Sequence, residues 1–128
     1  MIVDTSAIVA IIQEEPGFEA LLEKMTHAES RSMSAASYLE ASIVLIDRRG
    51  DSAEKELDQM LADAVIAIVP VTATQAKIAR AAFRNFGKGR DPAGLNLGDL
   101  FSYALAKQSG EALLFKGNDF SQTDVVMA

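Results

Sequence analysis

The sequence predicts a single α/β domain: a three-layer α/β/α sandwich with a central, mostly parallel sheet of four to five strands. Short β-branched runs alternate along the chain with longer segments whose apolar residues have helical spacing. Most of these runs are apolar on both faces, which is typical of strands in a parallel sheet covered by helices. The 128 residues, 49% of them hydrophobic, are enough for one core, and no linker or repeat divides residues 1–128.

The first half of the chain contains two expected strands and four expected helices. In chain order these are a strand at 1–4, helices at 6–13 and 18–25, a strand at 31–34, and helices at 34–49 and 53–63. The first strand is β-branched, and the helices repeat apolar residues every three or four positions. The motif "EEPG" interrupts the first helix, and Gly50 ends the third, because glycine readily adopts the conformation that follows a helix.

The second half continues the same alternation. We expect a strand at 65–71, a helix at 72–86, a loop at 87–96, a helix at 97–108, and strands at 111–115 and 124–128. The run "VIAIVPV" is β-branched and is closed by Pro70, while Gly110 ends the last helix. Ligand sites in such folds lie beyond the carboxyl ends of the strands, so the residues that follow each strand are the functional candidates.

Composition excludes several kinds of chemistry. The chain has no cysteine, and therefore no disulfide and no thiolate-bound zinc. Its one histidine, His27, lies in a polar stretch without a nucleophile motif, which argues against Ser–His–Asp catalysis and against paired imidazoles. No apolar run approaches the ~20 residues of a membrane span and no charged-then-apolar leader is present, so we expect a soluble cytoplasmic protein.

Isolated acids in apolar surroundings point to a functional site. Asp4 ends the first expected strand, at the edge of the sheet where ligands bind. Glu40 lies in the apolar helix "SAASYLEASIVLI", where an ionised carboxylate is costly unless it is paired or bound to a metal. A capping box over Ser37 and Glu40 is the structural alternative, but Ser34 is an equally good cap one turn earlier. We therefore favour a functional role for Glu40.

Two further acids are expected at the same edge of the sheet. Asp99 follows Gly98 at the start of a helix, and Asp119 follows the strand "ALLF" in the loop "KGND". Each alone is explained as well by a helix cap or an Asx-turn. Together with Asp4 and Glu40 they would repel one another unless a divalent cation joined them. Oxygen ligands without His or Cys suit Mg²⁺, or Mn²⁺ in its place, and the natural chemistry of such a site is phosphoester hydrolysis.

Three blocks of the sequence carry a resemblance to a known family. They are "DTSAIVAIIQEEP", "SAASYLEASIVL" and "GLNLGDLFSYALAKQSGEALLFKGNDFSQTDV". These blocks resemble the PIN-domain ribonucleases, and specifically the VapC toxins of bacterial type II toxin–antitoxin pairs. The resemblance runs from residue 1 to about residue 126, and the last block is the longest and the most specific.

The resemblance implies a PIN-like fold and metal-dependent endonucleolytic cleavage of RNA. The acidic quartet of the family matches Asp4, Glu40, Asp99 and Asp119. Supporting residues beside this site are expected at Ser6, Asn118 and Asp124. The resemblance also implies frequent homodimers and an antitoxin that masks the site. Because a carboxylate-rich site is best blocked by a basic side chain, we expect a VapB-type antitoxin to insert one.

The charge distribution adds candidate RNA-binding residues. The net charge is −6, yet residues 71–98 hold five basic residues and one acidic residue. Four of the basic residues are spaced by three, four and four, so a helix would align them on one face. This basic stripe consists of Lys77, Arg80, Arg84 and Lys88. A solvated charged face explains the stripe at least as well by its pattern, but the stripe leads into the loop before Asp99, and an acidic enzyme that acts on a polyanion needs cations beside its metals, so we favour RNA contact.

Other readings fit less well. A haloacid-dehalogenase-like phosphatase needs a second Asp two residues after the first, where this chain has Ser6. The acidic pair of a receiver domain and the Gly-x-x-x-x-Gly-Lys motif of P-loop NTPases are both missing. The alternative from a different class is a catalytically silent PIN-fold module that only binds its antitoxin. The four expected carboxylates argue against it, since a binding module has no need of them.

Overall fold

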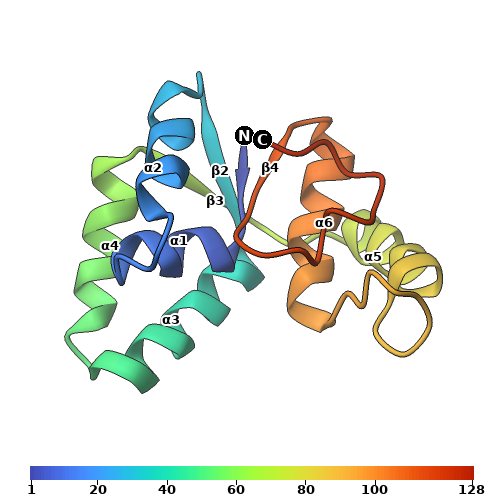
Figure 1. Ribbon diagram of the computed structural model, residues 1–128, viewed down its shortest axis with the longest axis horizontal. Helices are drawn as coiled ribbons and strands as arrows, with labels where there is room; N and C mark the ends of the chain where they lie inside the picture. Colours follow the sequence, from blue (N-terminus) through green and yellow to red (C-terminus); the bar gives the residue numbers. More distant parts are fainter.

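The computed structural model describes residues 1–128 and confirms the predicted α/β class (Figure 1). Its four strands are all parallel and form one sheet in the order β3-β2-β1-β4. The strands are β1 (Ile2–Val3), β2 (Arg31–Ser34), β3 (Ile66–Val69) and β4 (Leu113–Leu114). The helices are α1 (Thr5–Ile12), α2 (Phe18–His27), α3 (Ala35–Arg49), α4 (Ala53–Asp63), α5 (Ala73–Phe86) and α6 (Leu97–Ser109). No helix has the length and apolar character needed to cross a membrane.

Two sets of helices cover the two faces of the sheet. Helices α1 to α4 lie on one side and α5 and α6 on the other, with the strands between them (Figure 1). Because successive side chains of a strand point to opposite faces, Val3 and Leu114 belong to the core under α1 to α4. Ile2 and Leu113 belong to the core under α5 and α6. This arrangement is the predicted three-layer sandwich.

The strands are shorter than the sequence suggested. The segment 124–128, expected as a strand, contributes only an isolated bridge between Met127 and Leu113, so the sheet has four strands. The strand expected from residue 65 begins at Ile66, because Val65 has a left-handed φ of 52° that turns the chain out of α4. β1 and β4 have two residues each, and β1 ends early because Asp4, directly after it, already caps α1.

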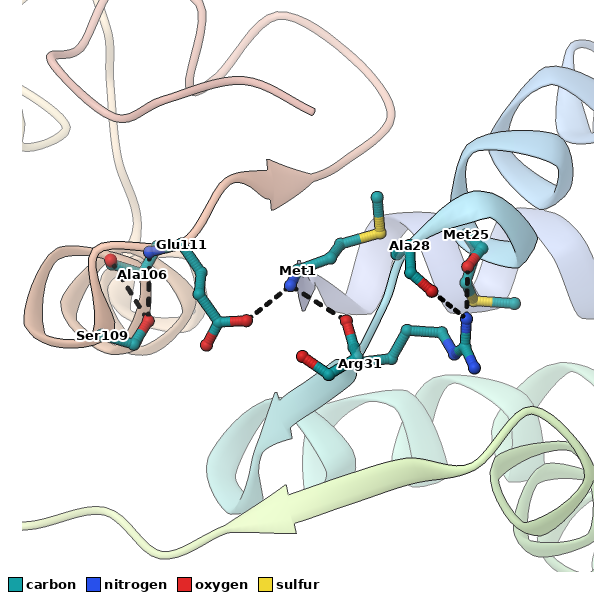
Figure 2. Close-up of polar contacts among 8 residues, drawn as sticks. Met1, Met25, Ala28, Arg31, Ala106, Ser109 and Glu111 are labelled. Carbon is teal, nitrogen blue, oxygen red and sulfur yellow. Dashed lines mark hydrogen bonds and ion pairs between the residues drawn. The ribbon is translucent and has the colours of Figure 1, made fainter.

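The amino-terminal end of the sheet is held by polar contacts (Figure 2). The Met1 ammonium donates to the Ser30 carbonyl at 3.0 Å and pairs with the Glu111 carboxylate at 2.6 Å, which ties the segments leading into β1, β2 and β4 together. The Arg31 guanidinium donates to the carbonyl oxygens of Met25 and Ala28, in the last turn of α2 and just beyond it, and so fastens β2 to the end of that helix (Figure 2). The polar groups at this end of the sheet are thus engaged in structural contacts.

Candidate active site

A cleft of about 380 Å³ opens at the carboxyl end of the sheet. Its walls come from the start of α1, the outer face of α3, the start of α6 and the segment that follows β4. Three of the four predicted acids line it, namely Asp4, Glu40 and Asp99. They come from distant parts of the sequence and meet here because parallel strands deliver the chain to the same edge.

Asp4 is the fixed member of the cleft. Its side chain caps α1: Oδ2 accepts the Ser6 N–H at 3.0 Å and the Ser6 hydroxyl at 2.7 Å. Oδ1 accepts the Ser102 hydroxyl at 2.5 Å. Asp4 is only 3% exposed, and this burial raises the pKa of its carboxyl, while the hydrogen bonds act in the opposite direction. The carboxylate is therefore held in one orientation, with a lone pair of Oδ1 still free to bind a ligand.

Hydroxyl groups connect Asp4 to the surrounding elements. The Ser6 hydroxyl oxygen accepts the Lys116 N–H at 3.0 Å, which links α1 to the segment after β4. The Ser102 hydroxyl lies 2.9 Å from the Ser37 hydroxyl, which links α6 to α3. The structure thus places Ser6, an expected supporting residue, in direct contact with Asp4, and this contact fixes the carboxylate from two sides.

Ser37 and Ser102 were missed in the sequence. Both are buried in helices that are otherwise apolar on that side, with exposures of 1% and 0%. Ser102 follows Asp99 by three residues and therefore lies on the same helix face. A buried hydroxyl one turn beyond a predicted ligand is the signal that could have identified it.

Asp99 both caps α6 and lines the cleft. It forms a capping box with Asn96, in which Asp99 Oδ2 accepts the Asn96 N–H at 3.0 Å and Asn96 Oδ1 accepts the Asp99 N–H at 3.0 Å. Burial, as the largest cause, raises the pKa of Asp99 to about 7, and the negative charges of Asp4, Asp119 and Glu40 act in the same direction. The cap explanation is therefore correct, but it does not exclude a functional role.

The Glu40 side chain has no hydrogen-bond or salt-bridge partner, and the absence of a side chain at a neighbouring glycine makes room for it. The N-cap of α3 is Ser34, whose side chain accepts the Ala36 N–H at 3.3 Å, so no capping box forms over Ser37 and Glu40. The Glu40 carboxylate lies against Gly98, where a Cβ would come within 2.1 Å of Oε2. The missing side chain at Gly98 is what allows α3 and α6 to bring their acids to one cleft.

The remaining predicted residues lie outside the walls of the cleft. Asp119 and Asn118 are exposed in the loop after β4, although the charge of Asp119 contributes to the raised pKa of Asp99. Asp124 is not brought to the acidic site: its Oδ1 accepts the Tyr103 hydroxyl at 2.5 Å and its Oδ2 pairs with Lys107 at 3.1 Å. Asp124 therefore fastens the C-terminal segment to α6 rather than supporting the acids.

The basic stripe also lies outside the cleft. Its members are exposed along α5 and just beyond it, and none of them lines the acidic pocket. Arg80 instead lines an apolar hollow with Leu97, Leu100 and Phe101 at the start of α6. The cations that do line the cleft, Arg48 and Lys116, were not singled out in the sequence.

The cleft acids suit a hard divalent cation by donor type. Every candidate ligand is a carboxylate oxygen, without His or Cys. As the side chains stand, no group of three is close enough to hold one ion. Asp4 is fixed, whereas the Glu40 carboxylate and Asp99 Oδ1 carry no hydrogen bond, so small shifts of these oxygens cost no existing contact. The residues therefore fit a metal that draws them together on binding.

Comparison with known sequences places the chain in a family. The PIN domain family matches residues 1–126. The chain belongs to the PIN-domain family. Within it, "Ribonuclease VapC" of Mycolicibacterium smegmatis is 54% identical over 125 residues, which cover 98% of this chain and 97% of that protein. "Ribonuclease VapC30" of Mycobacterium tuberculosis is 50% identical over 125 residues, with coverage of 98% and 95%.

A solved structure agrees on the fold. The crystal structure of Mycobacterium tuberculosis VapC20, a toxin that cleaves the sarcin–ricin loop, superposes on this chain with a TM-score of 0.80. The two chains are 19% identical, and the match covers 99% of this chain and 97% of VapC20. The architecture is therefore shared along nearly the whole PIN-domain chain even where the sequences have diverged.

Proposed function

We propose that this PIN-domain protein is a toxin endoribonuclease that depends on Mg²⁺ or Mn²⁺. One observation carries the proposal: Asp4, Glu40 and Asp99 line one cleft at the carboxyl end of the sheet, and no cation pairs with any of them. The names of the VapC ribonucleases that resemble this chain support RNA as the substrate. Asp119 would act from the rim, where its charge already reaches Asp99.

The residues of the chain have distinct parts in this proposal. A bound divalent cation would lower the pKa of an attacking water and neutralise charge on the phosphate. Asp4 would supply its oxygen from a fixed position, because Ser6 and Ser102 hold its carboxylate. Glu40 would contribute from the place that Gly98 leaves for its carboxylate, and Asp99 would use Oδ1 while Oδ2 keeps its bond to the helix cap.

Cleavage of RNA by the purified protein tests the proposal. We expect total cellular RNA to be cut at defined positions with Mn²⁺ or Mg²⁺ and to stay intact with EDTA, as read by mapping new 5′ ends. A thermal melt with and without Mn²⁺ gives a second readout, since an ion that binds only the folded state raises the melting temperature. RNA left intact in the presence of metal would favour the silent module that only binds an antitoxin.

We also propose that a VapB-type antitoxin masks this cleft. A pocket lined by Asp4, Glu15, Glu40 and Asp99 attracts a basic group, and Arg offers a planar fork that matches a pair of carboxylates. We expect an Arg of the antitoxin to enter the cleft and the toxin to form homodimers, which light scattering would detect. Unchanged antitoxin binding after alanine replacement of every Arg and Lys in its toxin-binding segment would contradict the masking proposal.

A further inference from the structure

Two basic residues line the acidic cleft, and only one of them is already paired. Lys116 Nζ lies 2.8 Å from Glu15 Oε1, and both residues belong to the cleft wall. Arg48 is exposed, and its side chain takes part in none of the four ion pairs of the molecule and in no hydrogen bond. Arg48 is therefore the free cation of the acidic cleft.

The position of Arg48 follows from the geometry of α3. Glu40, Val44 and Arg48 recur every fourth residue and line the cleft together. At 1.5 Å per residue, Arg48 lies about 12 Å along the helix axis from Glu40. Arg48 thus belongs to the same wall as the acids, about two turns of the helix beyond Glu40. A group at that distance suits a phosphate that neighbours the one under attack.

We propose that Arg48 binds a backbone phosphate of the RNA that flanks the scissile phosphate. This inference rests on the proposed ribonuclease function and adds how the polyanion is held. A cleft with four carboxylates repels RNA away from the metal, so a cation along its wall is needed to keep the strand in place. A free guanidinium forms two parallel hydrogen bonds to a phosphate, and such contacts position the strand without reading its sequence.

The neighbouring Arg49 shows that a position at the end of a helix does not by itself leave an arginine side chain unpaired. Both arginines lie in the last turn of α3, where a cation is favourable beside the helix dipole. Arg49 is engaged in structure: it pairs with Glu56 at 3.0 Å and donates to the Ile12 carbonyl at 3.3 Å. Arg48 has the same charge and helix position, but it lines the cleft and its side chain takes part in no ion pair or hydrogen bond, and this separates the two roles.

The matched pair of variants Arg48→Ala and Arg49→Ala tests the inference. Both remove one positive charge from adjacent residues, so a general effect of net charge would be equal in the two. The probe is a fluorescent single-stranded RNA of mixed sequence, with affinity measured by anisotropy at several KCl concentrations. An Asp4→Asn background keeps the RNA uncut. We expect Arg48→Ala to weaken binding about tenfold, the lower end of the loss of a charged hydrogen bond.

The salt dependence gives the second readout. Arg48→Ala should reduce the slope of log affinity against log salt by about 0.7, the contribution of one phosphate contact on a single strand. Arg49→Ala should leave both affinity and slope unchanged. Arg48→Lys should restore the slope, because it keeps the charge, but only part of the affinity, because it lacks the fork.

The outcomes separate this inference from the function on which it rests. Equal effects of Arg48→Ala and Arg49→Ala, or no effect of either, would overturn the role of Arg48 while leaving a ribonuclease in place. No RNA binding and no cleavage by the unaltered protein would instead overturn the proposed function itself. Thermal melts of each variant check that any loss of binding does not come from unfolding.

Discussion

The Ser102 hydroxyl donates a hydrogen bond of 2.5 Å to Asp4 Oδ1 across a sequence separation of 98 residues. This contact joins the end of β1 to α6, the helix that also carries Asp99. Ser102 is fully buried and is itself bonded to Ser37 of α3. The three elements that supply the cleft acids are thus tied together beneath the cleft by two hydroxyl groups.

Removing this hydroxyl should weaken the site without unfolding the protein. In Ser102→Ala the buried Asp4 loses its only partner on Oδ1, so its carboxylate is less well oriented and its pKa rises further. Loss of a contact that orients a metal ligand typically costs about 10- to 100-fold in metal affinity or activity. Mn²⁺ titration and RNA cleavage measure both.

Ser42→Ala is the matched control for Ser102→Ala. Ser42 also loses one hydroxyl, but its donor bond goes only to the Tyr38 carbonyl within α3. Cleavage and Mn²⁺ affinity should stay at the level of the unaltered protein. Equal losses in the two variants would show that Ser102 has no special relation to Asp4.

Asp4→Asn should abolish cleavage while the fold persists. The backbone N–H of Ser6 can only donate, so the amide oxygen must take the place of Oδ2 and the NH₂ must face Ser102. Ser102 can accept that proton if it donates to Ser37 in turn, because either hydroxyl of that pair can be the donor. The thermal melt should match or exceed that of the metal-free parent, since a buried charge is gone. Full cleavage by this variant would rule out the metal site.

For the other acids, the loss of cleavage on substitution should depend on whether the residue lines the cleft. Glu40→Gln and Asp99→Asn remove a charge from the cleft wall and should behave like Asp4→Asn. Asp119→Asn should be milder, because Asp119 is exposed and does not line the cleft. Cleavage assays on the four variants at one metal concentration rank them, and a loss at Asp119 as large as at Asp4 would contradict this order.

The stability of the metal-free protein should fall as the pH rises. The pKa of Asp99 is about 7 in the folded protein against an ordinary 3.8, so the folded state binds the extra proton between these values. The stabilisation that this proton provides is complete below about pH 4 and is lost as the pH rises through about 7. Urea unfolding in EDTA at pH 5 and pH 8 measures the fall. Asp99→Asn should reduce it, and an equal fall in both proteins would show that other groups cause it.

Much of the fold could be predicted because local signals and topology agree. The alternation of strands and helices, and the Gly50 and Gly110 ends of α3 and α6, appear in the structure close to the expected residues. The prediction of a strand at 124–128 was wrong, because a β-branched run alone does not show whether the segment will pair along a sheet edge. Its Asp124 found partners on α6 for the same reason: only the tertiary packing decides where a terminal segment lies.

The site was predictable where a residue type is out of place. Asp4 and Glu40 stand out as charges in apolar surroundings, and the structure puts both in the cleft. Ser37 and Ser102 do not stand out, because a serine in a helix is ordinary until its burial is known. Arg48 does not stand out either, because an exposed arginine at the end of an amphipathic helix is ordinary. Its spacing of four and eight from Val44 and Glu40 is the pattern that identifies it.

A methyl group at residue 98 should separate stability from activity. In Gly98→Ala the new Cβ would come within 2.1 Å of Glu40 Oε2, so the carboxylate has to move away. That carboxylate is the end of a flexible side chain without hydrogen bonds, and alanine favours a helix over glycine by up to about 1 kcal/mol. We expect the free energy of unfolding to stay level or rise. Cleavage should fall by about 100-fold, because a displacement of about 1 Å at a reacting group can cost that much.

The shorter acid at residue 40 provides the control for Gly98→Ala. Glu40→Asp withdraws the carboxylate from residue 98 by one methylene, so the added methyl group should then meet less resistance. Gly98→Ala should therefore cost much less activity in the Glu40→Asp protein than in the parent, even if Glu40→Asp itself lowers the rate. An equal fold-loss in both backgrounds would show that Gly98 acts through something other than the place it leaves for Glu40.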